Sequence, residues 1–251
     1  MKKIKVSVVS YLNSKPFIYG LQHSGILNEI DLSLDIPSVC AQKLMDNEAD
    51  IGLIPVAVIP LLKEKYIISD YCIGAIGKVH SVILYTEVPL EKIEKIILDY
   101  QSRTSVQLVQ VLAKHYWKIN PLFEAGDLDY ETKITNTTAA VIIGDRTFEL
   151  VGKYKYEYDL AEEWNKFTHL PFVFACWVAN KNISPAFSLK FNQALQLGME
   201  NKDKLIAELE NTGMYPFDLR LYLNKCISFE LDHQKKQGLE LFLSYLSKQI
   251  G

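Results

Sequence analysis

Apolar and polar positions alternate along the first third of the chain with two different periods. Runs of β-branched and apolar residues, typical of strands, occur at residues 4–9, 32–36, 50–55, 71–76 and 81–85. Stretches with apolar residues three and four apart, at residues 16–23 and 39–47, predict helices between the first of these strands. Pro16 suits the first turn of one helix, and Ser38 can cap the other. The chain therefore begins with a βαβ unit, which favours a largely parallel sheet.

The rest of the chain continues this alternation and then becomes helical. The elements predicted there are a short helix with a strand edge at residues 90–97, a helix at 102–117, and strands at 139–143 and 171–178. Four further helices are expected at residues 185–199, 202–210, 216–225 and 232–249. The strand at 171–178 is expected to return the chain to the part of the molecule formed first.

These elements predict an α/β protein of two lobes. Residues 1–88 and 179–251 are expected to form lobe I, and residues 89–178 to form lobe II as an insertion. Such an insertion is typical of two-lobed α/β proteins that hold a small ligand in the cleft between the lobes. Ligand sites of parallel sheets lie beyond the carboxyl ends of the strands, so the turns after the strands are the first candidates.

Composition and charge narrow the classes of function. The chain has 251 residues, of which 49% are hydrophobic, enough for a sizeable buried core. Its 27 Lys and Arg against 30 Asp and Glu give a net charge of −3 without a long basic run, which argues against a nucleic-acid partner. The sequence has no Walker A, GxGxxG or GxSxG motif, which disfavours P-loop, Rossmann and serine hydrolase chemistry.

Metal and disulfide chemistry have no support in the spacing of histidines and cysteines. The histidines form no HxxxH or HExxH pair, and the cysteines form no CxxC pair. We expect the cysteines to be reduced and mostly buried; they are Cys40, Cys72, Cys176 and Cys226. No metal, nucleotide or flavin cofactor is predicted.

The first residues resemble a secretion signal only superficially. Lys2 and Lys3 precede an apolar patch, but Lys5 interrupts it before the apolar run of about 7–15 residues that such a signal needs. No segment approaches the roughly 20 apolar residues of a membrane-spanning helix. We therefore expect a cytoplasmic protein without a membrane partner.

Polar residues suited to binding a small anion follow the first strand. Ser10, Tyr11 and Asn13 lie between the strand at 4–9 and the helix that starts at Pro16. Asn13 offers both a hydrogen-bond donor and an acceptor, and the free backbone N–H groups of the turn can receive a carboxylate. Alternatively, Asn13 only caps the helix. The spacing leaves both roles open.

A second turn begins at Asp99 and leads into the helix predicted at 102–117. Ser102, Thr104 and Ser105 place three hydroxyls near the helix start, beside the guanidinium of Arg103. A helix N-terminus attracts anions by roughly 0.3–1 kcal/mol when exposed. Anion binding is favoured here over the alternative, in which Ser102 or Thr104 only caps the helix and Arg103 pairs with Asp99.

A third turn follows the strand at 139–143. Gly144 would let a ligand approach the backbone closely. Asp145 is the one carboxylate of these turns considered as a base, although a helix cap or a pair with Arg146 is the favoured alternative. Ser81 lies at the expected crossing between the lobes and by itself is an ordinary strand serine.

Taken together, several segments resemble the chorismate dehydratase family of menaquinone biosynthesis. The segments are SYLNSKPF at 10–17, ADIGLIPVA at 49–57, HSVILYT at 80–86, LDYQSRTSVQLVQVL at 98–112, AAVIIGDRTF at 139–148 and DLAEEWNKFTHLPFVFACWV at 159–178. Their order and spacing also fit, and the resemblance covers residues 3–178 closely. The helical remainder fits in character only.

The resemblance implies a fold similar to type 2 periplasmic binding proteins, used by a cytoplasmic hydro-lyase of the futalosine route to menaquinone. The implied reaction converts chorismate to 3-[(1-carboxyvinyl)oxy]benzoate and water. Asn13 and Ser81 are implied to contact the reacting ring. The substrate-binding residues that the resemblance implies are Ser10, Tyr11, Ser102, Arg103, Thr104, Ser105, Gly144 and Asp145.

The residue types of the turns suit this reaction. Chorismate is a dianion that loses its C3 proton and its C4 hydroxyl as the ring becomes aromatic, so an enzyme must anchor carboxylates and help a hydroxide to leave. The turns contain no His or Glu. Our hypothesis is therefore that the enolpyruvyl carboxylate of chorismate accepts the proton. Two alternatives remain: a non-catalytic carboxylate-binding protein of the same fold, and the 1,4-dihydroxy-6-naphthoate synthase of the same pathway.

Overall fold

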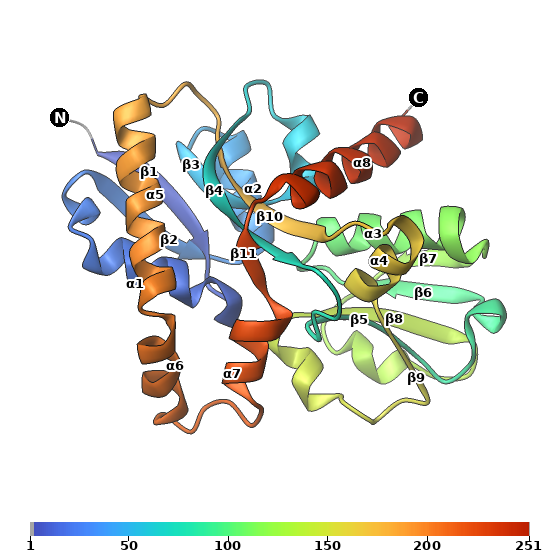
Figure 1. The fold of residues 1–251 in the computed structure, drawn as a ribbon. Helices are drawn as coiled ribbons and strands as arrows, with labels where there is room; N and C mark the ends of the chain where they lie inside the picture. The colour runs from blue at the N-terminus through green and yellow to red at the C-terminus, as the bar shows by residue number, and fades with distance from the viewer. Residues whose placement is uncertain (1–2, 251) are drawn as a thin grey trace.

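Two lobes, each built around one sheet, make up the molecule (Figure 1). The computed structural model describes residues 3–250, so residues 1, 2 and 251 of the expected lobe I lie outside the described range. Lobe I has a six-stranded sheet of order β11-β4-β10-β3-β1-β2. Its strands are β1 (Ile4–Val9), β2 (Ile30–Asp35), β3 (Ile51–Pro55), β4 (Tyr66–Ala75), β10 (Phe172–Ala179) and β11 (Ser228–Glu230).

The pairing of these strands follows from the order of the elements. β1 is parallel to both β2 and β3, as the βαβ start predicts, whereas the returning strand β10 is antiparallel to β3 and β4. The helices of lobe I are α1 (Lys15–His23), α2 (Pro37–Met45), α5 (Pro185–Glu200), α6 (Lys202–Glu210), α7 (Leu219–Leu221) and α8 (His233–Ile250).

Two glycines let α1 and α5 pack closely. A Cβ atom on Gly20 would lie 2.0 Å from the carbonyl oxygen of Ala194, and one on Gly198 would lie 2.0 Å from the carbonyl oxygen of Pro16. Real Cβ contacts are never this short, so only glycine fits at this helix crossing. The crossing fixes the start of α1, which closely follows Asn13.

Lobe II contains a five-stranded sheet of order β7-β6-β8-β5-β9. Its strands are β5 (Val82–Thr86), β6 (Lys95–Leu98), β7 (Leu122–Ala125), β8 (Thr138–Ile143) and β9 (Tyr156–Asp159). β6 is parallel to β7 and β8, whereas β5 is antiparallel to β8 and β9. The helices of this lobe are α3 (Thr104–Leu112), which a π-helical turn continues over Ala113–Trp117, and α4 (Leu160–Thr168).

The crossings between the lobes fall earlier than the sequence pattern indicates. β5 pairs with β8 and β9 of lobe II, so the chain leaves lobe I over residues 76–81 rather than at 88. It returns over residues 169–171 rather than at 178, because β10 is already a strand of the lobe I sheet. Apolar runs indicate strands but do not say which sheet they join, which is why both boundaries move.

Local details differ from the expected elements in a few places. Ser38 does not cap α2, because the helix starts one residue earlier at Pro37 and has no side-chain cap. The strands β7, β9 and β11 and the helix α4 are additions to the expected set. Asp159 caps α4 by accepting hydrogen bonds from the backbone N–H groups of Ala161 and Glu162.

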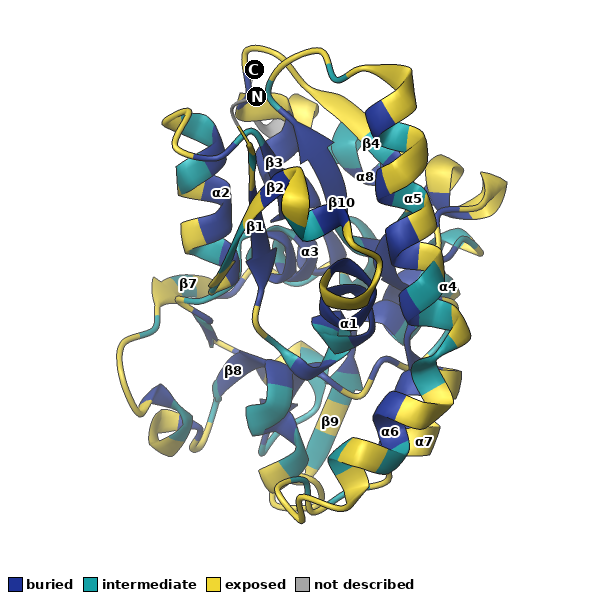
Figure 2. Cartoon of the chain, turned by 90° about the vertical axis from the view of Figure 1, so that its left-hand side faces the viewer, coloured by how far each residue is buried: buried dark blue, intermediate teal, exposed yellow. Residues whose placement is uncertain are grey.

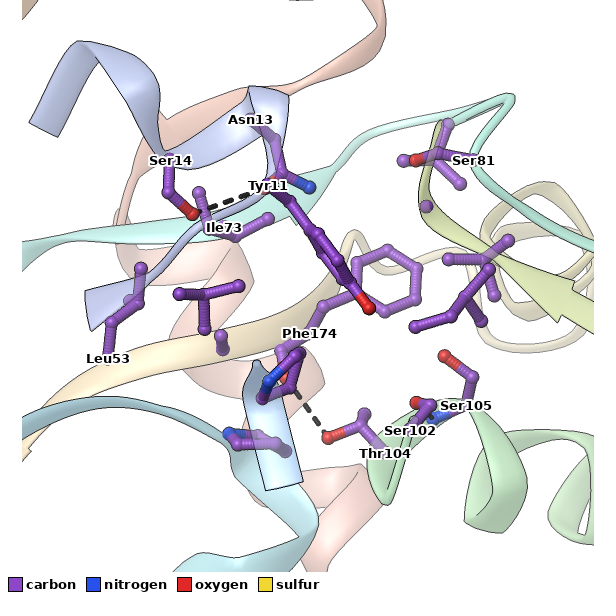
Figure 3. Close-up of a pocket in the computed structure, with 18 residues that line it drawn as sticks. Tyr11, Asn13, Ser14, Leu53, Ile73, Ser81, Ser102, Thr104, Ser105 and Phe174 are labelled. Atoms are coloured by element: carbon purple, nitrogen blue, oxygen red, sulfur yellow. Dashed lines mark hydrogen bonds between the residues drawn. The ribbon is translucent and has the colours of Figure 1, made fainter. Parts of the chain in front are cut away.

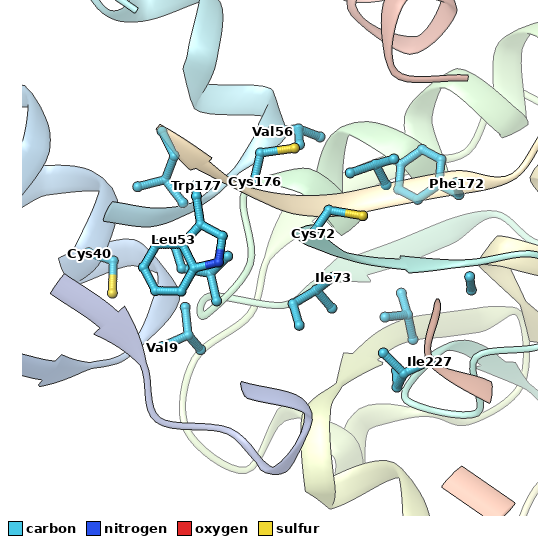
Figure 4. Close-up of a cluster of buried hydrophobic side chains, with 14 of the residues drawn as sticks. Val9, Cys40, Leu53, Val56, Cys72, Ile73, Phe172, Cys176, Trp177 and Ile227 are labelled. Carbon is cyan, nitrogen blue, oxygen red and sulfur yellow. The ribbon is translucent and has the colours of Figure 1, made fainter. Parts of the chain in front are cut away.

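A hydrophobic core runs beneath the sheet of lobe I and continues into lobe II. Figure 2 shows β1, β3 and β10 mostly buried, with exposed residues on the outer turns of α2 and α5. Trp177 lies in this core near Cys40 and Leu53 (Figure 4). All four cysteines are free and buried, as predicted. Burial raises the pKa of the Cys40 thiol to about 11, so it stays protonated at neutral pH.

Candidate active site between the lobes

A pocket lies between the lobes where the predicted turns meet (Figure 3). About 600 Å³ of space not filled by atoms lies within it, part of which is open solvent at the mouth. The sequence-predicted residues that line it are Tyr11, Asn13, Ser81, Ser102, Thr104, Ser105 and Gly144. The fold thus brings the three turns and the crossing serine into one cavity.

Asn13 lies in a short 3₁₀ turn, Leu12–Ser14, between β1 and α1. Leu12 is fully buried and anchors this turn in the core. No side chain caps the turn or α1, so the capping role considered for Asn13 is not observed. Instead, the Asn13 Oδ1 atom accepts a hydrogen bond from Ser14 Oγ at 3.2 Å, and its amide nitrogen lies 3.5 Å from the hydroxyl of Tyr222.

Ser81 enters the pocket directly before β5 and is only 2% exposed. The carboxylate of Asp159 holds the preceding crossing segment, because its Oδ2 atom accepts the backbone N–H groups of Val79 and His80 at 2.9 and 2.7 Å. The Ser81 carbonyl accepts the N–H of Gly144 at 2.9 Å. The Oγ atom of Ser81 accepts a hydrogen bond from the Tyr222 hydroxyl at 2.9 Å.

The hydroxyls at the start of α3 differ in their partners. Thr104 Oγ1 donates to the carbonyl of Phe174 at 3.0 Å and accepts from the N–H of Ala57 at 3.3 Å. Its proton is therefore committed to lobe I and is not available to hold a carboxylate. Ser102 Oγ accepts the N–H of Ser105 at 3.0 Å, which leaves the Ser102 proton free.

Arg103 does not reach the pocket. It borders a separate surface groove beside Leu61 and Leu246. The considered pair with Asp99 does not form either, because the buried Asp99 carboxylate binds Arg146 Nη2 at 2.5 Å and the Tyr130 hydroxyl at 2.7 Å. The spacing of charges along the sequence gave no sign of this long-range pair.

Gly144 and Asp145 have different positions relative to the pocket. Gly144 has a φ angle of +71°, which favours glycine, and a Cβ atom there would lie 3.5 Å from the Tyr11 ring. Asp145 is half-buried but is not among the residues that line the cavity, and it does not pair with Arg146. Burial raises the pKa of its carboxyl group, and the Lys15 ammonium opposes this rise.

Ser10 is exposed and lies outside the pocket. Its backbone N–H donates to the Asp35 carbonyl at 2.9 Å, which continues the pairing of β1 with β2. Its neighbour Tyr11 turns the other way, into the cavity, and donates to Gln101 Oε1 of lobe II. Alternation along an extended segment explains why adjacent residues face opposite sides.

No charged side chain lines this pocket within the described residues. Tyr11 is the one lining side chain with a titratable group there, and burial raises its pKa above the ordinary value. The site therefore offers neutral hydroxyls, an amide and the N-terminal end of α3. No cluster of three or more His, Cys, Asp or Glu side chains suited to a metal occurs in residues 3–250.

Tyr222 and Gln101 are site residues that sequence reasoning missed. Tyr222 comes from the C-terminal helical region, outside the segments of close resemblance. Gln101 lies inside one of those segments and contacts Tyr11 across the lobes. These two residues are recognised only from the structure, through the hydrogen bond of Tyr222 to Ser81 and that of Tyr11 to Gln101.

The fold and the interlobe pocket define a two-lobed protein with the periplasmic-binding-protein fold, as expected. A protein of Archaeoglobus fulgidus matches with a TM-score of 0.75 and 13% identity, over 98% of this chain and 97% of that chain. A Candida albicans protein with the generic periplasmic binding protein fold matches with a TM-score of 0.64 and 11% identity, over 97% and 91%. The periplasmic aliphatic sulphonate binding protein of Escherichia coli matches with a TM-score of 0.59 and 13% identity, over 98% and 88%.

The chain belongs to the menaquinone biosynthesis family, which matches residues 4–248. It is 25% identical to the chorismate dehydratase of Thermus thermophilus over 277 residues, covering 98% of this chain and 96% of that protein. These findings confirm the family that the six segments indicate. Within residues 3–250, no helix is long and apolar enough to cross a membrane.

Proposed function

We propose that this protein catalyses the dehydration of chorismate to 3-[(1-carboxyvinyl)oxy]benzoate in the cytoplasm. The main support is the convergence of Asn13, Ser81, Ser102 and Ser105 on one uncharged pocket between the lobes. Membership of the menaquinone biosynthesis family and the relative named chorismate dehydratase support the same assignment.

Each group of the pocket suits one requirement of the reaction. The N-terminal end of α3, with the free hydroxyls of Ser102 and Ser105, can hold a carboxylate. Asn13 and Ser81 contact the reacting ring and stabilise the departing C4 hydroxyl through hydrogen bonds. Tyr11 and Gly144 form a wall against which the ring can pack.

The proton acceptor is the enolpyruvyl carboxylate of chorismate itself. The C3–H bond breaks, its electron pair completes the aromatic ring, and the C4–O bond breaks to release hydroxide. The carboxylate passes the C3 proton to that hydroxide, which gives one water and restores the carboxylate. Tyr11 is a poor base because burial raises its pKa, and Asp145 does not line the cavity.

The decisive test is to incubate the purified protein with chorismate and a chelator and to identify products by chromatography and mass. We expect the dehydrated aromatic ether to form. Binding without conversion would favour a carboxylate-binding protein. If chorismate neither binds nor reacts, the assignment is wrong, and the precursor of 1,4-dihydroxy-6-naphthoate becomes the next substrate to try.

Substitution of Ser81 tests the proposed site. Ser81→Ala should lower kcat on the order of 10²-fold, as loss of one transition-state donor typically does. Ser69→Ala is a matched control, because Ser69 is also buried but its hydroxyl bonds Asn192 outside the pocket, at 2.7 Å. Equal kcat values for the two variants would show that the Ser81 hydroxyl does not take part in the reaction.

A further inference from the structure

Tyr222 lies where the C-terminal part of lobe I meets lobe II. It begins a π-helical turn, Tyr222–Cys226, directly after α7, and only 2% of its surface is exposed. Its ring packs edge-on against Phe148 of lobe II, with 5.1 Å between ring centroids. Turns of this kind often occur at functional sites.

The Tyr222 hydroxyl joins the two residues proposed to act on the substrate. It lies 2.9 Å from Ser81 Oγ and 3.5 Å from Asn13 Nδ2. The Asn13 amide nitrogen can only donate a hydrogen bond, so the Tyr222 oxygen is the acceptor in that contact. The Tyr222 hydroxyl donates its own proton to Ser81 Oγ. Burial raises the pKa of Tyr222, which keeps this proton in place at neutral pH.

This arrangement fixes what Ser81 can offer a ligand. Since Ser81 Oγ accepts from Tyr222, its own proton must be directed elsewhere. Ser81 Oγ donates no hydrogen bond to any described residue, and Ser81 lines the pocket. Its O–H bond is therefore free to point at the ligand, and Ser81 serves as a donor rather than an acceptor.

We propose that Tyr222 is a positioning residue, which orients Ser81 and, more weakly, Asn13 so that both present hydrogen-bond donors to the reacting part of the ligand. This inference rests on the proposed chorismate dehydratase function and adds a residue from the C-terminal region to it. The shorter contact makes Ser81 the main route of the effect.

A double-mutant cycle tests this role. Tyr222→Phe removes only the hydroxyl and keeps the ring packed on Phe148. We expect kcat to fall about three- to tenfold, which is the loss of rate expected when one hydrogen bond is misaligned. KM should change less than about twofold. In the Ser81→Ala background the same substitution should change kcat less than about twofold, because the Ser81 hydroxyl through which Tyr222 acts is already absent. Coupling to Asn13→Ala should be smaller.

Each rate is divided by the folded fraction of the variant, which is measured by thermal unfolding with near-ultraviolet circular dichroism. A loss of stability is then not mistaken for a loss of catalytic activity. Tyr85→Phe is the control, because it removes another buried hydroxyl, which donates to the Thr147 carbonyl at 3.1 Å. Its kcat should match that of the wild type.

The outcomes separate this inference from the function on which it rests. A wild-type protein without dehydratase activity would overturn both. An active wild type would overturn only the role of Tyr222 if Tyr222→Phe left kcat unchanged, or if it lowered kcat equally with and without Ser81.

Discussion

Three hydroxyl side chains near the start of α3 differ in what they can give a ligand. Thr104 is bonded at both its proton and its oxygen to lobe I, so it joins the lobes. Ser102 has a free proton, and Ser105 Oγ makes no hydrogen bond to any described residue. A hydroxyl has only one proton to donate. Whether such a side chain can donate to a ligand therefore depends on its existing hydrogen-bond partners more than on its residue type.

Asp145 allows a sharp test of the proton acceptor at the same scale. Asp145→Asn should leave kcat within about threefold of the wild type, because the proposed mechanism assigns the proton to the substrate carboxylate and Asp145 does not line the pocket. Loss of a general base would instead cost about 10²–10⁴ in rate. Steady-state kinetics decide between these values. A fall of that size with chorismate binding intact would make Asp145 the base.

Asp35 should govern part of the pH dependence of stability. Burial raises its pKa, but hydrogen bonds from Lys43, Ser7 and Ser33 outweigh burial and hold the pKa below 3.8. A lowered pKa stabilises the fold above the unfolded-state value, and the contribution is lost as pH falls through the folded-state value.

Asp35→Asn should therefore lower the free energy of unfolding at pH 7 by about 1–3 kcal/mol. Urea unfolding of both proteins should show this difference shrinking progressively below about pH 4. Asp31→Asn, on the same strand but exposed, is the control and should have little effect. A difference that stays constant with pH would exclude the linkage.

At the scale of elements, the crossing of α1 and α5 sets the position of the first turn of the site. Gly198→Ala would place a methyl group 2.0 Å from the Pro16 carbonyl and should destabilise the protein by about 1–3 kcal/mol or more. Thermal unfolding measures the loss. Gly77→Ala is the control, since no atom lies within 4 Å of its Cβ position. Equal melting temperatures for both variants would contradict close packing at this crossing.

At the scale of the whole molecule, the two lobes touch across the pocket through Tyr11 and Gln101. Tyr11→Phe removes this bond and should raise KM for chorismate about three- to tenfold, because one hydrogen bond that holds the lobes together is lost. Tyr100→Phe is the matched control. The Tyr100 hydroxyl also bonds Gln101, at 2.8 Å, but within lobe II. A KM equally raised in both variants would speak against an effect between the lobes.

The charge distribution predicts a weak effect of salt on binding. The protein has a net charge of −3, and none of the described residues that line the pocket is charged. Short hydrogen bonds in a buried site are screened much less than exposed ion pairs. KM for chorismate should therefore change less than about threefold between about 0.05 and 0.5 M salt. A steep rise of KM would indicate that a cation outside the pocket lining, such as Lys15, anchors the substrate.

Local sequence patterns determined much of the fold. The apolar run at Ile4–Val9 and the helical period at Lys202–Glu210 match β1 and α6 to the residue. The turn that contains Asn13, the start of α3 and Gly144 were also found from the sequence, because each follows an apolar strand and holds small polar residues. The family followed from the order of these segments.

Only the tertiary structure decided which side chains meet. Strand pairing placed β5 in the second sheet, a long-range ion pair joined Arg146 to Asp99, and Arg103, which precedes α3, borders a separate groove. The contact of Tyr222 with Ser81 joins residues 141 positions apart in the sequence. Periodicity reports the local environment of a residue, whereas sheet membership and hydrogen-bond partners depend on packing between distant segments.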